Sequence, residues 1–292
     1  MRLSNLCTLL GLVWLLLGVA AGLVAQAELA APGVDVFSFE ALVWFTHASR
    51  AHGVILLISL PLTAVAGAGF ALLTERGGGR VWAVVSMACI AGSVLLAAVQ
   101  IVASLSSILV ARDAAALVLA ATLTLCGAAT LANAVPKGPA HRSVRLYAGA
   151  GILALIGAAG VWTLVRGLTP SLRDSWVTTA AIHAVGVGLT LMLFAMLHRW
   201  MESHARPGRA WLSSLHAAGL LATGAAMSLA NVQLGLSGMP RGYADYPESL
   251  TEGHLYAMTA GILFITLVLA GIARIALMGR QGRDDAVEDT FA

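Results

Sequence analysis

Charged residues are scarce in this sequence. Asp, Glu, Lys and Arg together make up 11% of the 292 residues, whereas 59% are hydrophobic and the mean hydropathy is +0.87. A soluble domain carries roughly 25% charged residues. A water-soluble fold is therefore excluded. The basic residues are scattered and form no run, so a nucleic-acid partner is not indicated either.

Cysteine pairs and metal-ligand spacings are also missing. The three cysteines, Cys7, Cys89 and Cys126, lie far apart and form no CxxC or Cys/His pattern. Because disulfide frameworks and zinc sites require such spacings, we expect neither.

Acidic residues are absent from the middle of every long hydrophobic run, since all 14 lie in loops or at the ends of these runs. Proton pumps and ion-coupled carriers keep ionisable groups inside the bilayer. The pattern therefore argues against both classes. The polar residues Gln100, Asn231 and Gln233 still leave room for water-mediated paths.

Long apolar segments are what the sequence has in abundance, and each is long enough to cross a hydrocarbon core of roughly 30 Å. They are continuous and do not alternate with polar residues, which predicts α-helices and not a transmembrane barrel. We therefore predict an all-α, polytopic bundle of about eight transmembrane helices. It forms a single domain, 1–280, followed by a short, charged, frayed cytoplasmic tail, 281–292. The predicted spans are 4–26, 50–74, 81–110, 114–135, 146–168, 175–200, 210–233 and 253–278.

Basic residues indicate how the spans are oriented. If the N-terminus is cytoplasmic, the inner segments hold 12 Lys and Arg and the outer segments hold 5, as the positive-inside rule requires. We predict a multi-pass protein of a bacterial-type inner membrane with both termini in the cytoplasm. The first span has an alternative reading as a signal peptide cleaved near Ala25-Gln26-Ala27. Its apolar run exceeds the roughly 7 to 15 residues of a signal core, so we favour a retained helix.

Two of the eight histidines, His52 and His183, lie at similar depth. Each stands a few residues inside a span that enters the membrane from the outer side. Two neutral imidazoles that face each other in a bundle core are what a six-coordinate heme iron requires. Hydrogen bonds between helices are the alternative role. His198 and His216 lie near inner span ends, where we expect their rings to snorkel toward the headgroups.

One segment makes the chain resemble a known family. Leu234–Pro247, with the sequence LGLSGMPRGYADYP, resembles the LGLSGMPRRYxDYP loop of heme-copper oxidase subunit I. The stretch Asp174–His183 is similar to the family's DTYxVVAHFH segment. Gln26–Gly33 is similar to the RAELGQPG that ends its first helix, and Ala51–Gly53 resembles the AHG that opens its second.

The resemblance covers roughly 4–70 and 146–275 and leaves the third and fourth spans unaligned. It implies that His52 and His183 are the axial ligands of the family's low-spin heme. Ala181 stands where the family has the ligand of its high-spin heme, and neither an HPEVY segment nor a His-His pair supplies copper ligands. We therefore expect one bis-histidine heme, no copper and no oxygen chemistry, because such an iron has no open position for O2 or NO.

Further site residues are implied by the resemblance alone. Arg241 matches the first arginine of the GMPRR turn, which faces heme propionates in the family. Gln26 replaces an arginine that contacts the low-spin heme's peripheral group, and this favours heme b over heme a. Glu28 and Asp245 match carboxylates that form a calcium or sodium site in some members, although loop capping explains them equally well.

The predicted function is a membrane cytochrome subunit. It would bind one low-spin heme near the periplasmic face and transfer electrons within a larger respiratory-type complex, without being a terminal oxidase by itself. The expected partners are other subunits of that complex, a periplasmic cytochrome or redox subunit, or a quinone. Two alternatives stay open: a heme subunit that reacts with quinol or quinone, and a heme-free assembly or interaction subunit built on the same scaffold.

Overall fold

A computed structural model describes residues 2–30, 48, 49, 52, 53, 55–75, 77, 79–105, 142–167, 172, 175–202, 210–240 and 247–291. The described part is helical, and its only β-type pairing is an isolated bridge between Ser175 and Pro240. The all-α prediction is confirmed. The α-helices are α1 (Leu3–Ala30), α3 (Ala68–Glu75), α4 (Arg80–Leu105), α6 (Arg142–Gly167), α7 (Trp176–Glu202), α8 (Ala210–Leu236) and α9 (Thr251–Phe291).

Five of these helices are long and apolar enough to cross a membrane, which agrees with a membrane-embedded protein. The predicted count of about eight spans is not confirmed, because the span expected at 114–135 lies outside the described residues. Within the predicted second and third spans, the described residues include two shorter apolar stretches, Pro61–Glu75 and Arg80–Leu95, the latter forming part of α4. The five candidate spans are Leu3–Ala27, Arg142–Thr163, Trp176–Met201, Trp211–Leu236 and Glu248–Met278.

The segment between His52 and α3 is wound more widely than an α-helix. It contains two π-helical segments, Ile55–Ser59 and Pro61–Gly67. Proline has no N–H to donate to the carbonyl four residues earlier, so Pro61 interrupts the α-helical hydrogen-bond pattern. Widened turns of this kind often occur beside functional sites.

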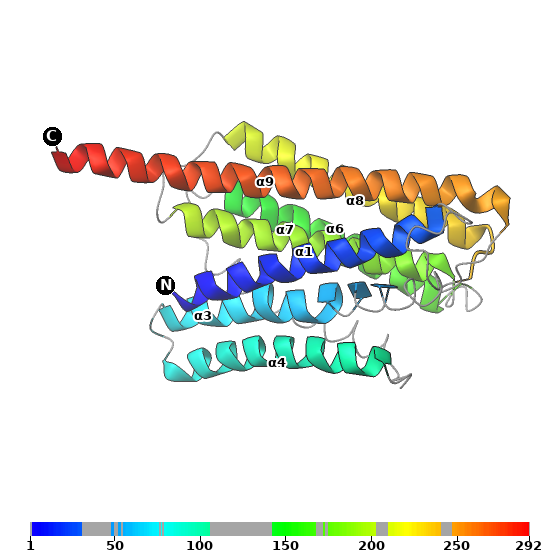
Figure 1. Ribbon diagram of the computed structural model, residues 1–292, viewed down its shortest axis with the longest axis horizontal. Coiled ribbons are helices and arrows are strands. Elements are labelled where there is room, and N and C mark those ends of the chain that lie inside the picture. The colour runs from blue at the N-terminus through cyan, green and yellow to red at the C-terminus, as the bar shows by residue number, and fades with distance from the viewer. Residues whose placement is uncertain are drawn as a thin grey trace.

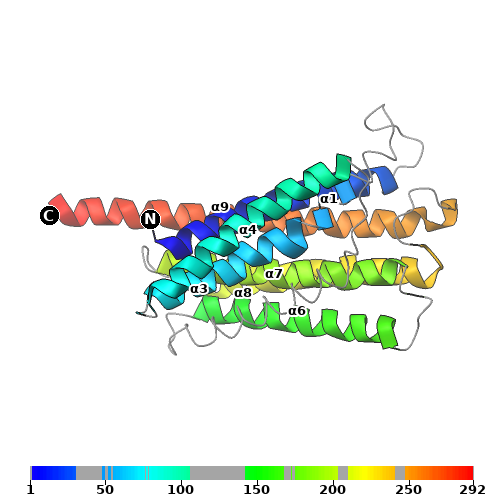
Figure 2. The same ribbon diagram turned by 90° about the horizontal axis from the view of Figure 1, so that it is seen from below.

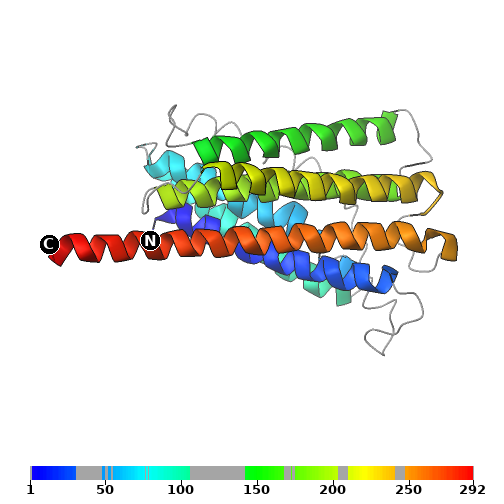
Figure 3. The ribbon, with the colours of Figure 1, turned by 90° about the horizontal axis from the view of Figure 1, so that it is seen from above.

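The helices run along one common axis (Figure 1). Helix α7 contacts α1, α6, α8 and α9, so it lies at the centre of the bundle. Figure 3 shows α6 on one side, α9 and α1 on the other, and α7 with α8 between them. We call the end with Arg2, Arg80, Arg142 and Arg199 the basic end, and the end with the Ser175–Pro240 bridge the distal end.

Both chain ends lie at the basic end, and α9 extends well beyond the other helices there (Figure 2). We expected a frayed tail after residue 280, but α9 continues as a helix to Phe291. No proline follows Pro247, so nothing in the sequence forces this helix to stop at the membrane surface. The cytoplasmic location of the two ends stays a prediction.

The core is centred on α7. Every residue of Val187–His198 is buried, and the large side chains packed there include Met192 and Phe194. The outward faces of α6 and α9 expose large apolar residues such as Ile156 and Leu263. A bundle whose apolar residues point both inward and outward suits a hydrocarbon solvent.

Candidate functional site

The structure brings together the two histidines that the sequence selects. The ring centres of His52 and His183 lie 5.8 Å apart, with the ring planes inclined at 67°. His52 precedes the π-helical segments, and His183 is on the second turn of α7. Segments far apart in the sequence therefore present two imidazoles to one another inside the bundle, toward its distal end.

Helix α1 fixes the orientation of the His52 ring. The Nδ1 atom of His52 lies 2.7 Å from the carbonyl oxygen of Gly18. A carbonyl oxygen only accepts, so Nδ1–H is the donor. In the neutral imidazole the lone pair then belongs to Nε2, which is the form that binds a metal ion. Gly22, one turn further along α1, packs so closely on the ring that an added Cβ would overlap it.

Asn231 on α8 is the corresponding partner of His183. Its side-chain nitrogen lies 2.7 Å from Nδ1 of His183, and the residue is fully buried. An amide nitrogen donates, so in this arrangement His183 carries its hydrogen on Nε2. A half-turn of the amide brings Oδ1 to Nδ1, and Oδ1 has no hydrogen-bond partner among the described residues. That orientation leaves the Nε2 lone pair of His183 available.

Helix α7 is less completely buried around His183 than further along the helix. Residues 182–186 are only partly buried, in contrast to the continuous buried stretch Val187–His198. A Cβ added at Gly186 would meet no atom within 4 Å, and Gly186 lies one turn after His183 on the same face. The same is true of Gly53, beside His52. Flat, side-chain-free backbone thus lies next to both imidazoles.

At the distal end of the site, the described parts of two stretches that carry the family resemblance, 175–183 and 234–240, meet each other. After α8, Gly238 turns the chain with a φ of 87°, a conformation that suits glycine. The turn lets Trp176 N–H donate to the carbonyl of Met239 at 3.3 Å, and Ser175 pairs with Pro240. The loop that follows α8 is therefore attached to the start of α7, two turns before His183.

Gln26 lies on the α1 face that also carries Gly18 and Gly22, at a spacing of four residues. Its Nε2 donates to the backbone carbonyl of His254 on α9 at 3.2 Å. The His254 ring is fully buried and meets Trp176 edge-on, with ring centres 5.0 Å apart. Gln26 therefore links α1 to α9 on the distal side of the histidine pair. The sequence alone indicated neither this contact nor the burial of His254 against Trp176.

Three other predicted site residues cannot be placed relative to the histidines. Arg241 and Asp245 lie outside the described residues, and for Glu28 the structure describes only the backbone, within α1. The described part of the chain holds no group of three or more His, Cys, Asp or Glu side chains that could bind a metal ion. The calcium or sodium site at Glu28 and Asp245 therefore stays a prediction.

A second cluster of polar aromatic residues lies toward the basic end. Tyr147 on α6 is buried, and its hydroxyl lies 2.6 Å from Nδ1 of His216. Nε2 of His216 lies 2.7 Å from the carbonyl oxygen of Leu267 and donates to it, so Tyr147 O–H donates to Nδ1. The Tyr147 ring also stacks on His198, with ring centres 4.9 Å apart.

The expectation that His198 and His216 snorkel to the membrane surface was wrong. His198 is 4% exposed, and His216 has both ring nitrogens engaged within the bundle. Because no nitrogen of His216 is free for a metal, this cluster differs from the His52–His183 pair. His198 follows His183 by 15 residues on α7, about 22 Å along the helix axis. The two clusters are therefore separate.

We found no match to this chain among protein-family models, curated proteins or solved structures. A functional assignment therefore depends on the geometry around His52 and His183 and on the resemblance described above.

Proposed function

We propose that this protein is a membrane cytochrome subunit, similar to a reduced heme-copper oxidase subunit I, that binds one low-spin heme through His52 and His183. It would transfer electrons within a larger respiratory-type complex of a bacterial-type inner membrane. The observation that carries the proposal is the approach of two imidazoles from different segments to 5.8 Å between ring centres.

The separation of the rings suits a shared iron. An imidazole nitrogen binds a metal ion at about 2 Å, and the nitrogen lies about 1 Å from the centre of its ring, so two imidazoles that bound one metal ion would have ring centres no more than about 6 Å apart. The observed 5.8 Å is close to this value. Gly18 and Asn231 engage the Nδ1 atoms of the two rings, so the Nε2 atoms are the ones left to bind a metal ion.

The hydrogen bonds on the far sides of the rings support ligation. Metal-bound histidines almost always donate their second N–H to a carbonyl or another acceptor, which fixes the tautomer and the ring orientation. The carbonyl of Gly18 has this position for His52, and the amide of Asn231 can take it for His183 with Oδ1 toward the ring. Gly53 and Gly186 offer backbone against which a flat macrocycle can pack.

A heme held by two imidazoles exchanges single electrons and has no open position for O2. The residues of this chain would orient the two ligands, exclude water from the iron and set the charge near the propionates. Arg241 would neutralise a propionate, since a guanidinium pairs well with carboxylates. Gln26 replaces an arginine of the family that the chain resembles, and this replacement favours heme b over heme a. The partners would be other subunits of the complex and a periplasmic cytochrome, redox subunit or quinone.

The proposal is tested by a reduced-minus-oxidised spectrum of the purified protein with pyridine hemochrome analysis. We expect one b-type heme per chain with a low-spin spectrum. His52→Ala and His183→Ala should each abolish this spectrum. His198→Ala, which removes another buried histidine from α7, should leave it intact. A normal low-spin spectrum in the His183→Ala variant would refute the assignment of the ligands.

The two alternatives predict different results. A heme-free assembly subunit would give no heme spectrum in the wild-type protein. A quinone-reactive subunit would give a low-spin heme whose reduction by a short-chain quinol is fast and is lost when a quinone analogue is added. A heme that is reduced by a periplasmic cytochrome and not by quinol would support the electron-transfer role.

A further inference from the structure

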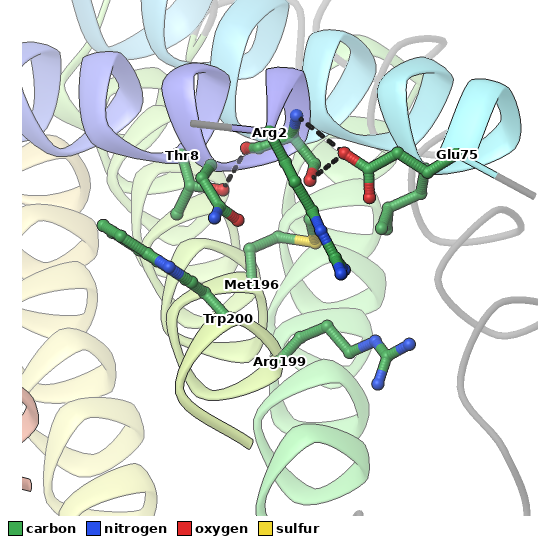
Figure 4. Close-up of a pocket in the computed structure, with 9 residues that line it drawn as sticks. Arg2, Thr8, Glu75, Met196, Arg199 and Trp200 are labelled. Carbon is green, nitrogen blue, oxygen red and sulfur yellow. Dashed lines mark hydrogen bonds between the residues drawn. The ribbon is translucent and has the colours of Figure 1, made fainter. Parts of the chain in front are cut away.

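A cavity of about 50 Å³ opens at the basic end of the bundle, far from the histidine pair. It lies where the start of α1, the end of α3 and the end of α7 meet, as Figure 4 shows. Its volume has room for a few water molecules and hence for one compact polar group. The lining residues are Arg2, Ser4, Asn5, Thr8, Leu72, Glu75, Met196, Arg199 and Trp200.

The polar lining of this cavity suits an anion. Two guanidiniums, those of Arg2 and Arg199, come to it from different segments, and neither forms an ion pair with another residue in the part of the chain that the structure describes. The one carboxylate in the lining, Glu75, accepts hydrogen bonds from Ser4 N–H at 3.3 Å and from Ser4 Oγ at 2.7 Å, both at the same oxygen. With two guanidiniums and one carboxylate, the charged side chains of the lining are net positive. Two like charges that share a cavity are stabilised by a group of opposite charge between them.

The surroundings favour a lipid over a soluble anion. The cavity lies at the ends of two candidate membrane spans, Leu3–Ala27 and Trp176–Met201, where headgroups meet the protein. From Asn5 in its lining, an exposed apolar stripe runs down α1 through Leu9, Val13 and Leu16. The spacing of three to four residues keeps this stripe on one face of the helix. An acyl chain can lie along this stripe while its headgroup occupies the cavity.

We propose that this cavity binds the phosphate group of an anionic phospholipid. Arg2 and Arg199 would donate charge-assisted hydrogen bonds to the phosphate oxygens. Trp200 would lie at the membrane interface, where its ring is commonly found. Basic pockets between transmembrane helices are a known chemical solution for anionic headgroups. The proposal does not depend on whether the protein binds heme.

The test is a titration of the full-length protein in detergent micelles with phosphatidylglycerol, followed by its thermal unfolding. A ligand that binds the folded state raises Tm in a concentration-dependent way. We expect phosphatidylglycerol, and not phosphatidylcholine, to raise the Tm of the wild-type protein. Arg199→Gln should need about tenfold more phosphatidylglycerol for the same Tm shift, since a hydrogen bond to a charged group is lost.

Two further variants keep the result interpretable. Arg2 lies before the first helix, so the Arg2→Gln variant should fold normally and show the same loss of affinity for phosphatidylglycerol. Arg80→Gln removes an exposed arginine from the same end of the bundle but outside the cavity, and it should respond as the wild type does. The visible spectrum should be the same in all three variants, which separates this result from that of the heme experiment.

Two outcomes would overturn the proposal. An equal response of the three arginine variants to phosphatidylglycerol would mean that the lipid acts through general charge at this end of the bundle. A Tm shift with inorganic phosphate alone that matches the shift with phosphatidylglycerol would assign the cavity to a soluble phosphate and not to a lipid.

Discussion

His52 and Gly18 are joined by a 2.7 Å hydrogen bond from the imidazole Nδ1 to the backbone carbonyl on α1. Gly22 then packs directly against the same ring. Helix α1 therefore sets both the orientation of the His52 ring and its tautomer. A side chain added at Gly22 would displace the His52 ring without replacing either proposed ligand.

We therefore predict that Gly22→Leu displaces His52 and removes the low-spin heme spectrum. The added side chain has no space, because the ring already contacts the position of a Cβ. Gly157→Leu is the matched control, since Gly157 is exposed on α6 and has open space around it. Heme content per chain after purification is the measurement. Normal heme content in the Gly22→Leu variant would show that α1 does not fix the position of the His52 ring.

Replacement of Asn231 by Leu should weaken heme binding without abolishing it. The substitution keeps the approximate volume but removes the group that orients His183 from Nδ1. Loss of such an orienting partner costs roughly 10- to 100-fold in metal affinity. Heme transfer to apomyoglobin from Asn231→Leu, compared with Gln233→Leu at an exposed position of the same helix, measures the effect. Equal transfer rates in the two variants would contradict the role of Asn231.

The sequence predicted the pairing of His52 and His183 but not the groups that orient them. Two histidines at similar depth in long apolar spans are visible in a sequence. The acceptor for His52 is the carbonyl of Gly18, and a backbone carbonyl has no side-chain signature. Asn231 was visible as a polar residue in a span, but its sequence position did not reveal which helix it faces.

His198 and His216 show why helix faces were harder to predict. Helices that are apolar on all sides carry no periodic signal that separates a lipid-facing side from a buried one. The sequence indicated only that these residues lie near span ends, and snorkelling followed from that. Their burial depends on Tyr147, which comes from a different helix, so only the packed structure could reveal it. Likewise, the span predicted at 50–74 contains Pro61, but the sequence did not reveal that the segment winds as a π-helix.

We predict that the purified protein contains no stoichiometric copper and that its reduced heme does not bind CO. The reason is that His52 and His183 would both be bound to the heme, that Ala181, which is buried, cannot ligate a second heme, and that the sequence has no HPEVY segment or His-His pair to supply copper ligands. Metal analysis and a CO difference spectrum of the dithionite-reduced protein are the measurements. A five-coordinate heme that binds CO would mean that one of the two ligands is wrong.

Arg241→Gln should lower the midpoint potential of the heme and keep its low-spin spectrum. A guanidinium beside a propionate offsets negative charge that otherwise stabilises the ferric state. Loss of a charge-assisted pair is worth about 1 to 2 kcal/mol. At about 59 mV per tenfold change in a one-electron couple, this corresponds to a decrease of roughly 40 to 90 mV. Redox titration of the two proteins measures it, and an unchanged or raised potential would show that Arg241 does not face the propionates.

The last prediction concerns Tyr147 and does not depend on heme. Tyr147→Phe removes the hydroxyl that donates to His216 Nδ1 and leaves that nitrogen without its donor inside the bundle. An unsatisfied buried polar group costs about 1 to 3 kcal/mol, so the free energy of unfolding should fall by that amount. Tyr256→Phe is the control, because Tyr256 is 64% exposed on α9 and should lose little.

The specific contribution of the pair is measured by a double-mutant cycle. His216→Phe removes the acceptor, and adding Tyr147→Phe to it should cost much less than Tyr147→Phe alone, because residues in direct contact are energetically coupled. Denaturant unfolding in mixed micelles gives the four free energies. Strictly additive losses would mean that the 2.6 Å contact between the phenol and the imidazole contributes nothing to stability, and that stacking of Tyr147 on His198 is what fixes α6 against α7.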